Sequence, residues 1–130
     1  MKLLIFGSRT LEGDEVQKVI KEYTAHNKPL MILTSGETAG VCAEARKYAK
    51  EQSLPLLLFW ANPKYHKGKY AQRSIQAINE CDKILFIHDG TSKGTSNEIK
   101  DAQKLFKPYT VKLLKDNQVE DWFINFDPEV

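Results

Sequence analysis

Short apolar runs recur along the chain at a nearly constant interval, and this interval most constrains the fold. The runs are LLIF at 3–6, LMIL at 30–33, LLLF at 56–59, ILFI at 84–87 and a weaker YTVKLL at 109–114. Each run begins 25 to 28 residues after the one before it. Continuous apolar runs without alternation are typical of strands that are buried on both faces of a parallel sheet. The sequence therefore predicts five such strands.

The segments between the runs have the spacing of amphipathic helices, in which apolar residues recur every three or four positions. The four predicted stripes are Val16, Val19, Ile20 and Tyr23; Val41, Ala45, Tyr48 and Ala49; Ala71, Ile75 and Ile78; and Ile99, Ala102, Leu105 and Phe106. Strand followed by helix, four times over, predicts a Rossmann-like three-layer α/β/α sandwich with a mainly parallel five-stranded sheet. An all-helical fold is the alternative, but the short runs and the Gly, Ser and Pro residues that follow them favour strands.

The charge is distributed unevenly along a chain whose 130 residues suit one domain. Residues 116–130 contain five acids and no Lys or Arg, so residues 1–115 hold 19 basic against 12 acidic residues, a net charge of +7. We interpret 1–114 as the domain and 115–130 as an acidic and aromatic extension. This extension could add an edge strand, cover a helix or contact a second subunit, and we expect a homodimer or higher homo-oligomer.

Targeting and redox features favour a reducing compartment. Cys42 and Cys81 have neither a C-x-x-C nor a metal-binding spacing, and the first apolar run is too short for a signal peptide. No run reaches the length of a membrane span. We therefore expect a cytoplasmic protein with no membrane partner. His26, His66 and His88 lack metal-ligand spacing, so no metal is predicted.

The four loops that follow the strands are unusually polar, and in a parallel sheet they all emerge at the carboxyl edge, where ligands bind. They are GSRT (7–10), SGETAG (35–40), WANPKYHKGKYAQR (60–73) and HDGTSKGTSNE (88–98). Glycines let backbone approach a ligand closely, and helix N-termini favour anions. From the first two loops the predicted ligand-binding residues are Gly7, Ser8, Arg9, Ser35, Gly36 and Thr38. Arg9 suits phosphate or carboxylate, and Thr38 could instead be a helix cap.

The third and fourth loops add basic, aromatic and acidic residues. Basic and aromatic side chains together can hold phosphate and stack a base, so Trp60, Lys69 and Arg73 are predicted ligand-binding residues. From the last loop the predicted ligand-binding residues are Asp89, Gly90, Ser92, Gly94, Thr95 and Glu98. Thr95 or Ser96 could also cap the following helix. A carboxylate beside phosphate donors suits ribose hydroxyls, so these loops together predict a nucleotide site.

With these motifs in order, the chain resembles the SLOG superfamily of Rossmann-like nucleotide-binding proteins over about residues 1–113. That family has G-S-R, then S-G-G-A-x-G-x-D, P-x-W-x-x-x-G-x-x-A-x-x-R-N and D-G-x-S-x-G-T. This chain has FGSRT, TSGETAGVCAEA, WANPKYHKGKYAQRS and HDGTSKGT. It departs from the pattern at three positions. Glu37 stands at the second glycine, Cys42 at the aspartate and Ser74 at the asparagine.

The resemblance implies binding of a nucleotide or an ADP-ribose-like ligand without another cofactor, and it leaves catalysis open. The related Lonely-Guy phosphoribohydrolases cleave nucleoside monophosphates and carry P-G-G-x-G-T-x-x-E. Here GTSNE matches the end of that motif, which places Glu98 at a functional glutamate, but P-G-G is absent. A nucleotide N-ribohydrolase with Glu98 and Arg73 as catalytic residues is therefore the first alternative. A single-stranded DNA-binding module that uses the +7 body is the second.

Overall fold

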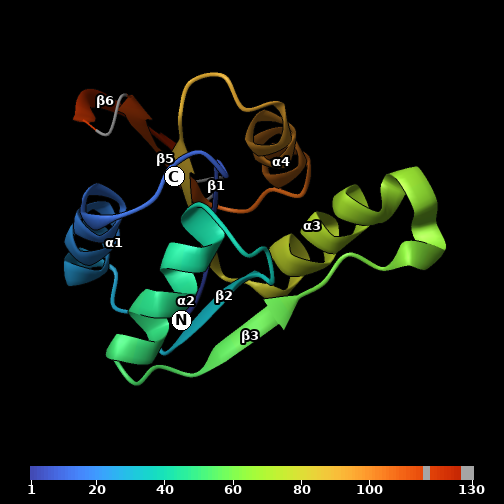
Figure 1. Ribbon diagram of the computed structural model, residues 1–130, viewed down its shortest axis with the longest axis horizontal. Coiled ribbons are helices and arrows are strands. Elements are labelled where there is room, and N and C mark those ends of the chain that lie inside the picture. The colour runs from blue at the N-terminus through green and yellow to red at the C-terminus, as the bar shows by residue number, and fades with distance from the viewer. Residues whose placement is uncertain (116–117, 127–130) are drawn as a thin grey trace.

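The computed structural model describes residues 1–115 and 118–126, except the side chains of 65–67 and 118–125. Figure 1 shows a central sheet with helices on both sides. In chain order the elements are β1 (Lys2–Gly7), α1 (Asp14–His26), β2 (Met31–Ser35), α2 (Val41–Glu51), β3 (Leu56–Phe59), a 3₁₀ turn (Pro63–Gly68), α3 (Lys69–Glu80), β4 (Lys83–His88), α4 (Lys93–Lys104), β5 (Tyr109–Lys115) and β6 (Gln118–Phe126).

The sheet has the strand order β3-β2-β1-β4-β5-β6. The first five strands of the chain run parallel, and β6 pairs antiparallel with β5. The predicted Rossmann-like α/β class with five parallel strands is confirmed. The order reverses between β1 and β4, because the chain builds outward from β1 to β3 and then returns to the other side of β1.

The two faces of the sheet bury alternate residues of the same strands. Leu3 and Ile5 pack with α1 and α2 on one face, whereas Leu4 and Phe6 pack with α3 and α4 on the other. The helices therefore form two outer layers around the sheet, as Figure 1 shows. All eight residues of the stripes predicted for α1 and α2 are buried, so these two predictions are confirmed.

The stripes predicted for α3 and α4 are wrong in part. Ala71 is exposed, and α3 instead buries Arg73 and Ser74 ahead of its apolar contacts. Leu105 and Phe106 lie beyond the end of α4, where Phe106 is 72% exposed. The face of α3 that lies nearest the carboxyl edge of the sheet is therefore polar. A prediction that relies on the spacing of apolar residues could not identify such a face.

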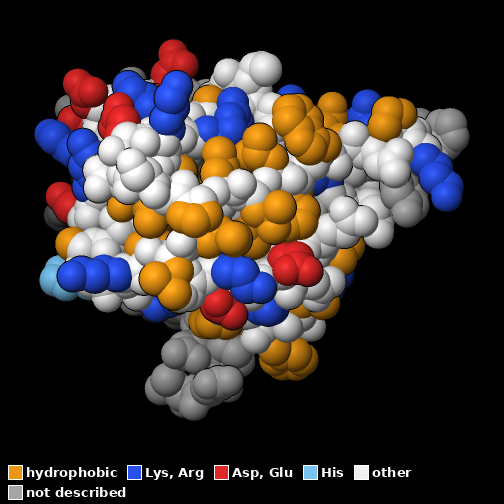
Figure 2. Space-filling view, turned by 90° about the horizontal axis from the view of Figure 1, so that it is seen from below, with side chains coloured by type: hydrophobic (Ala, Val, Ile, Leu, Met, Phe, Trp, Pro, Cys, Tyr) orange, Lys and Arg blue, Asp and Glu red, His pale blue; other side chains and the backbone are white. Residues whose placement is uncertain are grey.

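The run at β3 is not buried on both faces, contrary to the prediction from its composition. β3 is an edge strand, and it leaves Leu56 and Leu57 exposed, together with Trp60 just beyond its end. Figure 2, which views the molecule from below relative to Figure 1, shows hydrophobic side chains gathered on that face. The apolar run thus predicted the strand correctly but not its position in the sheet.

The described part of the C-terminal extension forms an edge strand, one of the three placements that the sequence left open. β6 pairs with β5 from Tyr109 opposite Phe126 to Lys115 opposite Gln118, and the rings of Tyr109 and Phe126 stack with centroids 5.1 Å apart. The side chain of Trp122 lies outside the described residues. Among the described helices, none has the length and hydrophobicity that a bilayer crossing would require. Homo-oligomerisation stays a prediction.

Candidate functional site

A cavity of about 480 Å³ opens at the carboxyl edge of the sheet, between the ends of β1 and β4. This position is the point where the strand order reverses, which is where ligands bind in open α/β sheets. Gly7 from the end of β1 and Asp89 from the end of β4 contribute to its wall, and the first turns of α3 and α4 complete it.

The structure brings about half of the predicted ligand-binding residues to this cavity and places the rest outside its lining. The predicted residues that line it are Gly7, Arg9, Arg73, Asp89, Ser92, Gly94, Thr95 and Glu98. The predicted residues outside the lining are Ser8, Ser35, Gly36, Thr38, Trp60, Lys69 and Gly90.

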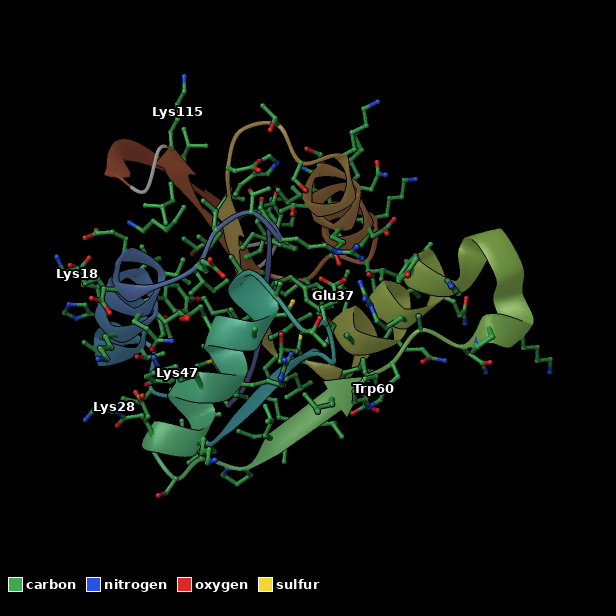
Figure 3. All side chains as sticks on the ribbon, viewed as in Figure 1. Lys18, Lys28, Glu37, Lys47, Trp60 and Lys115 are labelled. Carbon is green, nitrogen blue, oxygen red and sulfur yellow. The ribbon has the colours of Figure 1, made fainter. Side chains whose placement is uncertain are left out.

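A chain of ion pairs crosses the cavity and links four segments, the loops after β1 and β2 and the helices α3 and α4. Arg9 donates from Nε and Nη2 to the two carboxylate oxygens of Glu37, both at 3.2 Å. Arg73 Nη1 donates to Glu37 Oε1 at 2.9 Å, and its Nη2 lies 3.5 Å from Glu98 Oε2. Figure 3 shows Glu37 on the loop that follows β2. Glu37 thus bridges two arginines, and Arg73 bridges two glutamates.

The guanidinium of Arg73 is the buried centre of this chain. Its side chain is only 7% exposed, and its Nε has no hydrogen-bond partner among the described residues. The guanidinium carbon lies 5.6 Å from the ring centroid of Phe6 and 5.5 Å from that of Tyr70. Contacts with two aromatic rings and two carboxylates hold the guanidinium in place.

Glu98 is a buried carboxyl with an unusual protonation equilibrium. Burial raises its pKa to about 7, while the hydroxyl of Ser74, which donates to Oε2 at 2.8 Å, and the charge of Arg73 act in the opposite direction. Because desolvation outweighs both, Glu98 is near half-protonated at neutral pH. A carboxyl of this kind can both accept and donate a proton, which is the requirement for a general acid–base.

Glu37, in contrast, stays ionised. Burial opposes its ionisation, but the hydrogen bonds and charges of Arg9 and Arg73 outweigh this and hold the pKa of Glu37 below its ordinary value. The cavity lining includes Arg9 and Arg73 as cations against four carboxyl side chains, those of Glu37, Asp89, Glu98 and Asp101. The cavity is therefore less positive than the +7 body of the chain would suggest.

Asp89 organises the fourth loop. Its carboxylate accepts hydrogen bonds from the amides of Thr91 and Ser92, both at 2.8 Å, and from the hydroxyl of Thr10 at 2.6 Å. Burial opposes its ionisation, but these bonds hold the pKa of Asp89 well below its usual range. Asp89 therefore ties the loop after β4 to the loop after β1, although it also lines the cavity.

The N-terminus of α4 faces the cavity. Ser92, not Thr95 or Ser96, is the N-cap, and its hydroxyl accepts from the amide of Thr95 at 3.3 Å. The next amides, those of Lys93 and Gly94, belong to the first turn, where a helix leaves its N–H groups without an intrahelical acceptor. A Cβ added at Gly94 would meet nothing within 4 Å. The site therefore has room for a ligand anion at a helix N-terminus.

Two glycines allow close packing around the end of β1 and the loop that follows it. A Cβ on Gly7 would clash with the carbonyl oxygen of Ile87, and one on Gly40 would clash with the backbone of Arg9. Gly40 also has a φ of +82° and is the N-cap of α2, a role that the sequence left open for Thr38. These glycines are explained by packing, and Gly7 reaches the cavity as well.

The other predicted residues outside the cavity have structural contacts of their own. Ser8 accepts from the amide of Asp89 at 3.0 Å, and Ser35 accepts from the amide of Glu37 at 3.3 Å. Gly36 lies against the ring of Trp60, where a Cβ would clash. Figure 3 shows Trp60 just beyond β3. The remaining two are Gly90, which has a φ of +93°, and Lys69, whose ammonium lies 5.0 Å from the ring centroid of Tyr70.

His88 is explained by the loop that it supports. Its Nδ1 accepts from the amide of Gly90 at 2.6 Å, so the proton lies on Nε2, which is 2.9 Å from the hydroxyl of Ser96. Burial lowers the pKa of His88, against the charge of Asp89. Among the side chains that the structure describes, no group of three or more from His, Cys, Asp or Glu could hold a metal ion.

Sequence reasoning missed several cavity residues. Glu37 and Ser74 stand out in the sequence only as departures from the SLOG pattern, and both contact Arg73. Tyr70 is the aromatic residue in the lining, whereas the prediction chose Trp60. The missed polar residues of the lining are Thr10, Asn97 and Asp101, whereas Thr91 belongs to the hydroxyl residues of the predicted fourth loop. Asp101 lies three residues after Glu98, and this helical spacing is the pattern that could have indicated it.

Comparison with known proteins gives no independent support for a family. The chain matches no protein-family model, and no curated protein is similar to it.

Proposed function

We propose that the cavity binds a nucleotide or a nucleotide-derived ligand such as ADP-ribose. The observation that carries this proposal is the pairing of Arg73 with Glu98 beside the N-terminus of α4, at the strand-order reversal. A guanidinium and free helix amides suit phosphate oxygens, and a carboxyl group suits ribose hydroxyls. These three groups lie on one cavity large enough for a small ligand.

The individual roles follow from geometry. The amides at the start of α4 and the guanidiniums of Arg9 and Arg73 would contact phosphate. Glu98 would accept hydrogen bonds from ribose hydroxyls, and the ring of Tyr70 offers an aromatic face for a base. Gly94 would leave the space through which phosphate approaches α4.

Thermal unfolding in the presence of a nucleotide panel tests this proposal. AMP, GMP, ADP, ADP-ribose and a dinucleotide would each be added at millimolar concentration, with sodium phosphate as the control for a general anion effect. A ligand at a hundred times its dissociation constant stabilises a protein by about 2.7 kcal/mol. In a domain of this size that raises the melting temperature by about 8–16 °C. If no member of the panel exceeds sodium phosphate, the proposal fails.

One observation favours a second candidate, a nucleotide N-ribohydrolase. Burial raises the pKa of Glu98 to about 7, which is the value that general acid–base catalysis at neutral pH requires. In this reaction water adds to the anomeric carbon of the ribose, the bond from that carbon to the base breaks, and the base leaves with a proton. Glu98 would take the proton from the water or give one to the base.

Chromatography of overnight incubations separates binding from hydrolysis. Wild type and Glu98→Gln would each be incubated with AMP and GMP, and free base would be quantified. Hydrolysis predicts free base from the wild type and a rate at least about a hundredfold lower in Glu98→Gln, with binding retained. Binding alone predicts no free base from either protein.

A further inference from the structure

The carboxylate of Glu37 lies where the anionic group of a ligand would be expected. Two guanidinium groups donate to it, with Arg9 reaching both oxygens at 3.2 Å and Arg73 reaching Oε1 at 2.9 Å. Paired N–H donors of this kind, from more than one arginine, are also how proteins bind phosphate. The cavity therefore already contains an anion of its own.

This internal anion occupies the cations that line the cavity. In the part of the lining that the structure describes, Arg9 and Arg73 are the basic side chains, and both bind Glu37. Glu37 stays ionised, because the two arginines hold its pKa below the ordinary value despite burial. Near neutral pH, an incoming phosphate must therefore compete with a full negative charge.

Glu37 is placed so that it can be displaced. It lies between the end of β2 at Ser35 and the start of α2 at Val41, in a segment without helix or strand hydrogen bonding. The side chain of Arg9 is 62% exposed and can follow a ligand, whereas that of Arg73 is 7% exposed and contacts two aromatic rings. Exchange of Glu37 for a phosphate would thus need movement of one loop side chain and leave Arg73 in place.

We propose that Glu37 is a specificity-determining residue, an internal anion that competes with ligand phosphate for Arg9 and Arg73. The competition weakens binding of every phosphate ligand, and most of all those with several charges. This inference rests on the proposed nucleotide function of the cavity. The opposite arrangement, in which Glu37 stays bound and orients the arginines for the ligand, predicts changes of the opposite sign.

Calorimetric titration with AMP, ADP and inorganic pyrophosphate distinguishes these arrangements. The proteins are wild type, Glu37→Gln, which keeps the shape but not the charge, and Glu37→Ala, which removes the competing group. Asp101→Asn is the control, because it removes the same charge from the same lining, and the ion pairs of Arg9 and Arg73 among the described residues do not include Asp101. Melting curves of each variant show that it is folded before titration.

We expect Glu37→Gln and Glu37→Ala to bind pyrophosphate and ADP at least about tenfold more tightly than wild type, since each frees charged hydrogen bonds. The increase in affinity for AMP should be smaller. For all three probes, Asp101→Asn should increase the affinity less than either Glu37 variant does. Unchanged or weaker pyrophosphate binding in both Glu37 variants would overturn the proposal.

The same titrations separate this inference from the proposed function. If wild type binds nucleotides and the Glu37 variants bind no more tightly, competition by Glu37 is wrong and the nucleotide site stands. If wild type binds no nucleotide but the Glu37 variants bind pyrophosphate, Glu37 does compete with phosphate for the two arginines and the nucleotide proposal fails. If no protein in the set binds any probe, both proposals are wrong.

Discussion

Arg73 on α3 and Glu98 on α4 lie with Nη2 and Oε2 3.5 Å apart in the buried wall of the cavity. Both side chains are nearly inaccessible, at 7% and 12% exposure. An ion pair at this depth contributes little net stability, because desolvation of the two charges offsets their attraction. The pair is therefore better explained by a role in the cavity than by a role in folding.

The protonation of Glu98 should make stability depend on pH. Its pKa in the folded protein is about 7, above the ordinary 4.5, so the folded state binds more protons than the unfolded state between these values. The contribution of Glu98 to the free energy of unfolding should therefore be highest below pH 4.5 and fall as pH rises through 7. Glu98→Gln cannot titrate at this position, so its free energy of unfolding should not fall in this way. Relative to wild type, the variant should become more stable as pH rises, from little difference at pH 5 to up to about 3 kcal/mol at pH 8.

Urea unfolding of wild type and Glu98→Gln at pH 5, 6, 7 and 8 measures this difference. Glu51→Gln is the control, because Glu51 is exposed at the end of α2. The free energy of unfolding of Glu51→Gln should have the same pH dependence as that of wild type. A constant difference between Glu98→Gln and wild type would mean that Glu98 is not a buried titrating group.

Removing Arg73 should destabilise the fold. Arg73→Met leaves Glu37 and Glu98 without the cation between them, and the loss of a partner from a buried ion pair costs about 3–5 kcal/mol. The cost should be larger at pH 8 than at pH 5, since Glu98 is protonated at the lower pH. Arg46→Met is the matched control, because Arg46 donates to the backbone oxygen of Ser35, and the ion pairs of Glu37 and Glu98 among the described residues do not include Arg46. Equal pH dependence in the two variants would contradict the ion-pair chain.

Asp89→Asn should loosen the loop after β4. The side-chain amide cannot accept from the amides of Thr91 and Ser92 and the hydroxyl of Thr10 as a carboxylate does, so we expect a loss of about 1–3 kcal/mol at pH 7. The folded-state pKa of Asp89 lies well below the ordinary 3.8, so its contribution is fully present above pH 3.8 and is lost progressively as pH falls from there through the folded-state pKa. Urea unfolding at pH 7 and pH 3 checks both statements: the deficit should be smaller at pH 3 than at pH 7, and an equal deficit at the two pH values would refute the electrostatic explanation.

Gly94→Val should separate ligand binding from stability. A Cβ at Gly94 meets nothing within 4 Å, so the change in unfolding free energy should stay within about 1 kcal/mol. The branched side chain would fill the space beside the α4 amides and weaken nucleotide binding at least about tenfold. Gly68→Val is the matched control, since Gly68 also has open space but lies outside the cavity lining. Equal affinity in the two variants would remove the start of α4 from the site.

The sequence predicted the strands, the fold class and the edge that carries the cavity, because apolar runs and loop polarity depend on local composition. It mispredicted β3, since the same run LLLF suits either a central or an edge strand. Within the site it identified Arg73 and Glu98 but missed the Ser74 hydroxyl that contacts both of them and the Glu37 carboxylate that binds Arg73. The contacts of Ser74 with Glu98 and of Glu37 with Arg73 join residues 24 and 36 positions apart, and a single sequence contains no direct record of such contacts.

Backbone amide NMR during titration with AMP locates the ligand without assuming an activity. Nucleotide binding in the cavity should give saturable shifts of the amides in residues 7–10, 37–40 and 91–98, with Lys93 and Gly94 among the largest, and little change at Leu56 and Leu57 on the β3 edge. Absence of saturable shifts, or shifts confined to surfaces away from the cavity, would contradict it.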